Sequence, residues 1–281
     1  MRSLSSLPHR TAQRLSDQVG AELRILYGGV SRLSNVRVTT RIRTVLLTFV
    51  LVLIATSSAL GHCVWPETPA SIGAGEEFTV PVYFAHPDDP IDERDLAELS
   101  LYAVAPDGET LEFHLVKAET YNYAQVTLNQ AGLHVFYAER PGARYRITQE
   151  IRDIGKSITY VDSEALLVQD PIGLDLEISV VEAVQVDGGL VEITLQILYK
   201  DSPVDEGGVE VFRSVEPGDT SLYQEIDDLD VDENGRVTLV IDPSYNYVFE
   251  TDHRVPAREV DGTPFGVTQV RFRSALFLGA R

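Results

Sequence analysis

Alternating apolar and polar residues dominate the chain after residue 62, and this pattern restricts it to an all-β fold. Residues 78–84 (FTVPVYF) have Phe and Val at every second position, and residues 191–199 (VEITLQILY) repeat the pattern. Such a period of two is typical of strands with one buried face. Helical character is confined to a short, highly charged segment at 92–99. Pro81 interrupts the first pattern and predicts an edge strand, because proline has no N–H for a second neighbouring strand.

Turn residues separate these strands at short intervals. Residues 105–108 (APDG) lie between apolar runs at 99–104 and 111–116, which predicts a hairpin. The sequence QDPIG at 169–173 marks a candidate boundary, after which strand patterns resume. Short strands joined by Gly- and Pro-containing turns are typical of sandwiches. We therefore expect two immunoglobulin-like β-sandwich domains, residues 62–170 and residues 171–281.

The first 61 residues have a different character and resemble a targeting segment. Arg37, Arg41 and Arg43 precede an apolar run at 45–55, and small residues follow up to Gly61. This order predicts an N-terminal extension with a secretory signal peptide, cleaved between Gly61 and His62. The apolar run is shorter than the roughly 20 residues that a membrane span needs, so retention as an anchor is the weaker alternative. The processed chain is expected to be periplasmic or extracellular and not itself membrane-spanning.

Charge divides the chain in the same place. Residues 1–61 hold eight Arg and two acidic residues, whereas residues 62–281 hold 15 basic and 41 acidic residues, a net charge of −26. A field of this sign repels phosphate backbones and attracts cations, so nucleic acid is not an expected partner. The single Cys excludes an intramolecular disulfide.

Sequence motifs of common catalytic sites are missing. The chain has no P-loop, HExxH, GxSxG or CxxC motif, and we expect it not to be an enzyme. The acidic segment Asp228–Asp232 starts like a calcium-binding loop but lacks the glycine at position six and the closing glutamate.

Two histidines are the candidate metal ligands. Cleavage after Gly61 would make His62 the first residue, so that its α-amine and imidazole could chelate Cu²⁺ or Ni²⁺. His86 ends the strand pattern at 78–85 and could supply a further nitrogen from a rigid edge. The alternative is that His86 only caps a turn before Pro87. Cys63 could add a thiolate, although a buried structural Cys is the more common situation.

Several short motifs, in order, resemble the exported NikM-like family of domains of unknown function, which is linked to periplasmic nickel and cobalt uptake. They are HCVW at 62–65, AHP at 85–87, AGLHV at 131–135, GLDLEI at 173–178, LYKDSP at 198–203 and DENGR at 232–236. The last two resemble the carboxypeptidase-regulatory-like sandwich of that family, and they fall in the second expected domain. His62 and His86 occupy the family's histidine positions, whereas Ala85 replaces its usual glycine and Cys63 is not a general feature. The resemblance implies β-sandwich domains and a metal-binding role.

Together these features predict an extracytoplasmic protein that captures Ni²⁺ or Co²⁺, with Cu²⁺ as a further candidate, at His62 and His86. Its expected partner is a membrane metal transporter component. Two alternatives stay open: a structural or adhesive β-sandwich protein without metal, and a copper oxygenase that uses the two histidines as a brace.

Overall fold

Strands make up most of the regular structure in the computed structural model, which describes residues 62–145, 147–163 and 167–281. The pattern at 78–84 forms β3 (Glu77–Ala85), and the predicted hairpin is β4 (Ser100–Val104) paired with β5 (Thr110–Phe113). The all-β fold class is therefore confirmed. The charged segment at 92–99 overlaps only a short 3-10 turn, η2 (Ile91–Glu93). The predicted signal peptide lies outside the described residues.

The other elements follow in chain order. They are β1 (Cys63–Pro66), β2 (Ser71–Ile72), β6 (Val116–Lys117), β7 (Asn122–Thr127), β8 (Gly132–Tyr145), β9 (Gln149–Val161), β10 (Leu176–Gln185), η3 (Asp187–Gly189), β11 (Val191–Tyr199), β12 (Ser202–Pro203), β13 (Gly208–Ser214), β14 (Tyr223–Asp230), β15 (Arg236–Ile241), β16 (Tyr247–Pro256), η4 (Ala257–Glu259) and β17 (Gln269–Leu278). No helix in the described ranges is long and apolar enough to cross a membrane.

One nine-stranded sheet joins the two halves of the described chain. Its order is β14-β13-β16-β17-β9-β8-β4-β5, with β2 also paired to β9. The expected boundary near residue 170 falls between β9 and β10, but β17 returns to pair in parallel with β9. Residues on both sides of that boundary therefore build the same sheet, within the single unit Gly61–Arg281.

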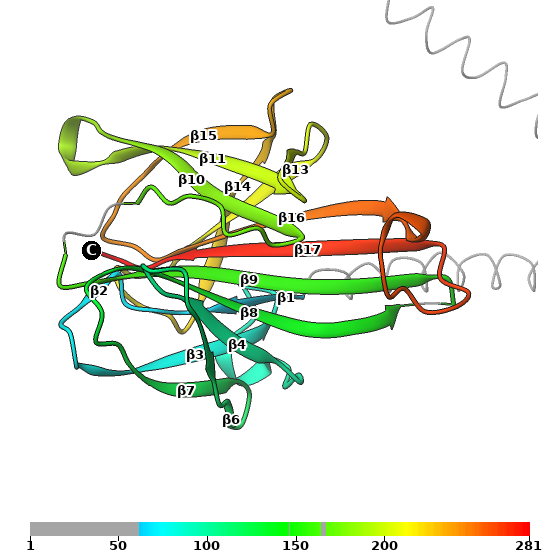
Figure 1. Cartoon of the computed structure of the whole chain (residues 1–281). Coiled ribbons are helices and arrows are strands. Elements are labelled where there is room, and N and C mark those ends of the chain that lie inside the picture. The colour runs from blue at the N-terminus through cyan, green and yellow to red at the C-terminus, as the bar shows by residue number, and fades with distance from the viewer. Residues whose placement is uncertain (1–61, 146, 164–166) are drawn as a thin grey trace, which may run out of the picture. The chain divides into compact units, whose positions relative to one another are not determined.

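Two four-stranded sheets pack against this central sheet on opposite sides (Figure 1). The sheet of β10, β11, β12 and β15 covers one face and encloses the largest apolar core, which includes Ile178, Leu195 and Phe249. The sheet of β1, β3, β7 and β6 lies on the other side and contributes to two smaller cores. Val64 belongs to one of these cores, and its neighbours Cys63 and Trp65 belong to the other.

The backbone of β1 lies directly against the central sheet at Gly155 of β9. A Cβ atom at Gly155 would overlap the backbone of Val64 and Trp65. Gly155 is paired with Ala275 of β17, so two small residues form the floor on which β1 rests. The missing side chain at Gly155 therefore sets how close the outer sheet can approach.

Pro81 does not lie in an edge strand, so that expectation is wrong. Strand β3 has β1 on one side and β7 on the other. The Pro81 carbonyl accepts the N–H of Glu67 at 2.9 Å, just beyond the end of β1 at Pro66. In an antiparallel strand the nitrogen of a residue points to the same side as its carbonyl. The N–H that Pro81 lacks would point toward β1, at the position where the hydrogen bonds between β1 and β3 end. The hydrogen bonds between β3 and β7 are therefore unaffected.

Gly155→Ala tests the close approach of β1. We expect the substitution to lower the free energy of unfolding by about 3 kcal/mol, because the added methyl group forces two backbones apart. Gly73→Ala is the control, since a Cβ at Gly73 would have its nearest contact at 3.6 Å, from Glu76 Oε2. Urea denaturation of both variants measures the difference. Equal stability of the two variants would show that β1 does not depend on Gly155.

Candidate metal site

A row of residues across the central sheet leads from the floor beneath β1 to two glutamates. Successive strand pairs place Gly155 beside Ala275, Ala275 beside Glu250, and Glu250 beside Glu210. Their side chains therefore lie on one face, the face against which β1 rests. Beyond Ala275 the small residues of this row are followed by the two glutamates.

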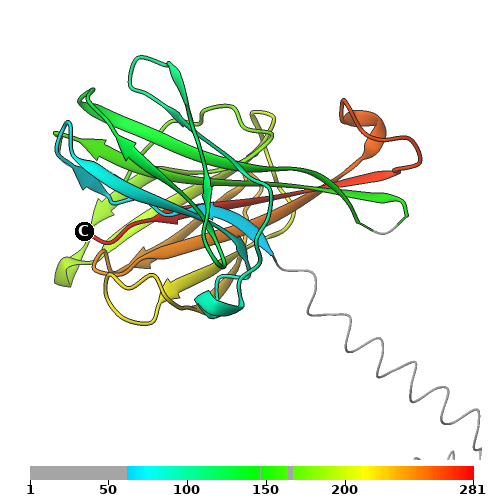
Figure 2. The same cartoon turned by 90° about the horizontal axis from the view of Figure 1, so that it is seen from below.

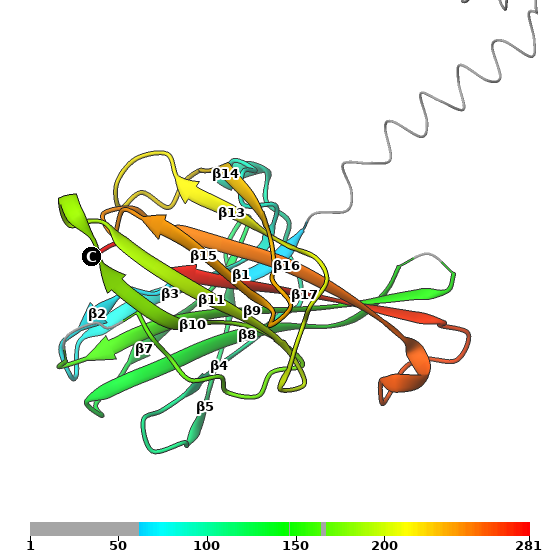
Figure 3. The ribbon, with the colours of Figure 1, turned by 90° about the horizontal axis from the view of Figure 1, so that it is seen from above.

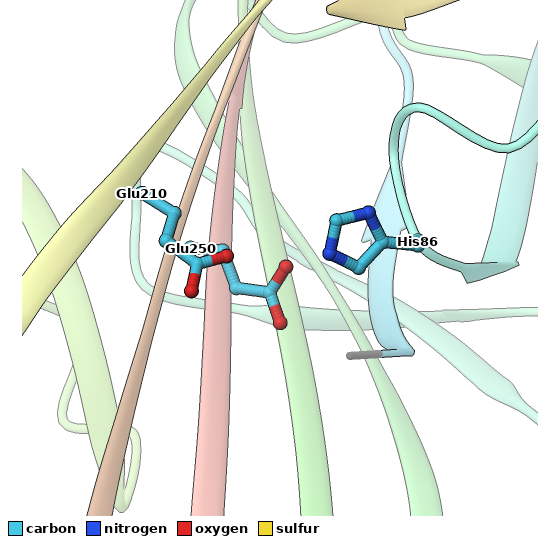
Figure 4. Close-up of side chains that lie close together, drawn as sticks. All are labelled: His86, Glu210 and Glu250. Atoms are coloured by element: carbon cyan, nitrogen blue, oxygen red, sulfur yellow. The ribbon is translucent and has the colours of Figure 1, made fainter. Parts of the chain in front are cut away.

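His86 reaches the same place from the end of β3. Its ligand atom and those of Glu210 and Glu250 all lie within 4.8 Å of one another. Figure 4 shows the imidazole facing the two carboxylates, which come from neighbouring strands, β13 and β16. One nitrogen and two oxygens within this distance can close around a single divalent cation of the first transition series.

The loop after β3 fixes the orientation of His86. Asp88 Oδ1 lies 2.5 Å from His86 Nδ1, and Asp89 Oδ2 accepts the backbone N–H of His86 at 3.0 Å. The ring also packs edge-on against Phe212, with the ring centres 5.2 Å apart. A proton on Nδ1 shared with Asp88 leaves Nε2 as the nitrogen with a free lone pair, and Nε2 is directed at the glutamates (Figure 4).

Glu250 forms the buried end of the site. Its residue is only 7% exposed, and its Oε2 has no hydrogen-bond partner among the described residues. Burial, followed by the charge of Glu210, raises the pKa of Glu250 from 4.5 to about 8. Burial also raises the pKa of Glu210, with the nearby His86 opposing this effect. When both are ionised, carboxylates directly opposite in an antiparallel pair repel each other, and a cation between them would favour release of the Glu250 proton.

The site has an open side and a closed side. Glu210 is exposed, His86 is half-buried and Glu250 is buried. Cys63 of β1 lies beside Glu250 on the closed side, and burial together with the Glu250 charge raises the pKa of its thiol well above its usual range. Cys63 is thus a neutral buried thiol, as its alternative interpretation predicted.

His62, the other predicted ligand, lies next to this group but is not part of it. Its Nδ1 is 3.3 Å from Asp95 Oδ2, and its Nε2 is 3.9 Å from Asp89 Oδ2. Its ring packs on Phe84 of the core that contains Val64, whereas His86 packs on Phe212 of the core that contains Cys63. The two rings therefore pack on different sides of the β1–β3 pair. Only Asp89 contacts both residues.

Glu210 and Glu250 were not among the predicted site residues. In VEVF (209–212), Glu210 alternates with apolar residues and resembles an ordinary outward-facing position. Glu250 gives a clearer signal, because it follows the apolar run YVF (247–249) inside a strand that is buried on both faces. A buried glutamate needs a hydrogen-bonding or charged partner, and the sequence does not reveal which residue that partner is.

The fold is all-β, and it brings one imidazole and two carboxyl groups together at the edge of β1. The sequence profile of the family described as "Domain of unknown function (DUF4198)" matches residues 59–255. The chain belongs to this family. No curated protein gives a significant match.

Solved structures resemble the chain only remotely. A DUF4785 family protein from Legionella pneumophila is 10% identical with a TM-score of 0.27, over 67% of this chain and 51% of that chain. Alpha-2-macroglobulin from Escherichia coli is 14% identical with a TM-score of 0.27, over 78% of this chain and 16% of that chain. The Salmonella alpha-2-macroglobulin mutant Y1175G is 12% identical with a TM-score of 0.26, over 77% and 15%. The chain thus spans about half of the first of these proteins and less of the others.

The raised pKa of Glu250 predicts a pH dependence of stability in the metal-free protein. Between pH 4.5 and 8 the folded protein holds a proton on Glu250 that the unfolded chain releases. The free energy of unfolding therefore falls as pH rises through this window. Glutamine cannot titrate, so Glu250→Gln lacks this pH-dependent loss. The difference in free energy of unfolding between Glu250→Gln and the unchanged protein should therefore rise, in favour of the variant, by about 2–4 kcal/mol from pH 5 to pH 8.

Urea denaturation across this pH range measures the effect. Glu192→Gln, at an exposed position of β11, is the matched control and should leave the pH dependence unchanged. Parallel curves for Glu250→Gln and the unchanged protein would contradict the assignment of a buried, protonated Glu250.

Proposed function

We propose that this protein is a non-enzymatic extracytoplasmic protein that binds a divalent transition metal at His86, Glu210 and Glu250 and delivers it to a membrane transporter. The observation that carries the proposal is the buried, unpartnered Oε2 of Glu250 within 4.8 Å of ligand atoms from His86 and Glu210. A buried carboxylate oxygen without a partner is costly, and a bound cation would remove that cost.

The ligand set favours particular metals. Imidazole nitrogen suits nickel, copper, zinc and iron, whereas sites made only of oxygen suit calcium and magnesium. One imidazole with two carboxylates therefore favours a transition metal over calcium or magnesium. The resemblance to the family linked to nickel and cobalt uptake supports Ni²⁺ or Co²⁺ as the cargo, with Cu²⁺ as a competitor. The Cys63 thiol adds no thiolate, because burial keeps it protonated.

The geometry also suits capture and release. Three protein ligands leave coordination positions for water or for a ligand from a partner. The exposed Glu210 gives the ion a route to the buried Glu250, and the acidic body raises the local cation concentration. Export by the predicted signal peptide would place this site where a membrane transporter could receive the ion.

Calorimetric titration of residues 62–281 with NiCl₂, CoCl₂ and CuCl₂ tests the proposal. We expect one ion per chain, with affinity lowered by at least about 100-fold in His86→Ala and in Glu250→Gln, because each removes a ligand. His114→Ala, at an exposed histidine outside the strands, is the control and should bind like the unchanged protein.

His62→Ala separates the site seen here from the pair predicted from sequence. Unchanged binding in His62→Ala with loss in His86→Ala supports the His86, Glu210 and Glu250 site. Full affinity in both His86→Ala and Glu250→Gln would overturn the proposal.

Asp88 is expected to set metal affinity without binding the ion. It holds the proton on His86 Nδ1 and so keeps Nε2 available to the metal. Asp88→Ala should weaken Ni²⁺ binding by about 10- to 100-fold, as expected for a residue that orients a ligand. Asp92→Ala, an exposed aspartate of the same loop, serves as the control. Equal affinities of these two variants would assign Asp88 no role in the site.

A further inference from the structure

Strands β8, β9, β16 and β17 extend beyond the body of the sandwich as an arm (Figure 2, Figure 3). We define the arm as residues 139–153 and 252–273. It contains the turn that joins β8 to β9 and the longer loop that joins β16 to β17.

The end of the arm carries the most exposed large apolar side chains of the described residues. Phe265 is 100% exposed and Ile147 is 83% exposed, whereas the next value, for Val240, is 51%. A fully exposed Phe gains nothing from packing within this chain. Large exposed apolar side chains at one place indicate a surface that meets a partner or a membrane.

The two loops form a single tip. The N–H of Thr268 donates to the Thr148 carbonyl at 2.8 Å, and the Arg144 guanidinium donates to the Phe265 carbonyl at 2.6 Å. These bonds tie the turn that carries Ile147 to the loop that carries Phe265. The two apolar side chains therefore lie at the same end of the arm.

The arm also differs in charge from the rest of the protein. It contains eight of the 15 basic residues found after residue 61 but only six of the 41 acidic ones, which gives the arm +2 and the remainder −28. Three of the four acidic residues on its strands are paired with arginine: Asp153 with Arg140, Glu150 with Arg152, and Asp252 with Arg271.

The exposed arginines of the arm lie toward its end. Among the described residues they are Arg144, Arg254 and Arg258, of which Arg258 lies 3.5 Å from Glu259 and Arg254 lies 3.5 Å from Asp252. An anionic surface would attract this end and repel the body, so only one orientation of approach is favourable.

The chain enters the body at the base of the arm. His62 and the Arg140 guanidinium both pack on Phe84, at 5.3 Å and 4.4 Å from its ring centre. The base of the arm therefore adjoins the first described residue of the chain.

We propose that the tip of the arm binds the surface of an anionic phospholipid membrane, with Phe265 and Ile147 inserted among the headgroups and arginine side chains on the lipid phosphates. The difference in charge between the arm and the acidic body determines which end of the protein approaches the membrane, and the apolar side chains insert into it. The paired loops present both groups without a conformational change.

Sedimentation with vesicles tests this proposal on residues 62–281, which form one unit with their own cores. This chain avoids the apolar run at 45–55, which would itself bind lipid. At low salt, partition onto vesicles of equal parts phosphatidylcholine and phosphatidylglycerol should exceed partition onto phosphatidylcholine alone by about tenfold or more. High salt should abolish the difference.

Substitutions at the tip should act through both contributions. Phe265→Ala should lower partition by about tenfold, because it removes the largest apolar group that inserts. Arg254→Gln with Arg258→Gln should lower it by a similar factor and reduce its salt dependence, without removing the Arg144 bond that joins the two loops. Val240→Ala, at an exposed apolar residue of β15 outside the arm, is the matched control and should have no effect.

Three outcomes would overturn the proposal. They are equal binding to neutral and anionic vesicles, equal effects of Phe265→Ala and Val240→Ala, and no binding to either vesicle. The last result is the one expected if the tip meets a protein instead. Thermal unfolding checks that each variant is folded. Because Phe265 is fully exposed, Phe265→Ala should have the unfolding temperature of the unchanged protein.

Discussion

Both outer sheets pack on strand β9 at two consecutive residues, which face opposite sides of the central sheet. Gly155 admits the backbone of β1 on one face. Lys156, buried on the other face, donates to Glu177 Oε1 at 2.6 Å and to Ser179 Oγ at 2.9 Å, both in β10. A buried ion pair is favourable only when its remaining polar atoms are also bonded.

Glu177 meets that condition and thereby fixes the path of the chain between the halves. Besides Lys156, its carboxylate accepts the N–H groups of Ile172, Gly173 and Leu174, at 2.9 to 3.2 Å. The segment after β9 is therefore attached to the central sheet before β10 begins. Since β17 then pairs with β9, neither half completes its sheet without the other.

The candidate site follows from this shared sheet. His86 comes from the first half, and Glu210 and Glu250 come from the second, so the three side chains meet because β1, the partner of β3, rests on β9 and β17. The close approach at Gly155 allows a histidine at the end of β3 to reach a glutamate on β16. Metal binding would in turn add a link between the outer sheet and the central one.

The fold class and much of the strand pattern could be predicted from the sequence, because a period of two reports local burial. Pairing partners could not be predicted in the same way. The position of β3 between two strands depends on where β1 ends, which no pattern around Pro81 reveals. Likewise, the alternation that identifies β13 and β16 as strands does not show that Glu210 and Glu250 lie opposite each other.

The same limit applies to the histidines. Position at the end of a strand identified His86, and the structure places it beside two carboxylates. His62 was selected for its place at the predicted cleavage point, and the structure places it against Asp95 and Phe84 instead. Neighbours in sequence report which residues end a strand, whereas the face on which a side chain packs depends on contacts made far along the chain.

Charge acts at two ranges in this protein, and the two have different consequences. The acidic body attracts any cation, so its field can raise the rate of capture but cannot choose between metals. Choice requires short-range chemistry, and under the proposed function the imidazole nitrogen that faces a buried carboxyl group would supply it. The burial that makes Glu250 costly to ionise would also strengthen its attraction for a cation placed beside it, provided that the remaining ligands offset the cation's lost hydration. A single inward-facing glutamate can therefore matter more for selectivity than the many acidic residues on the surface.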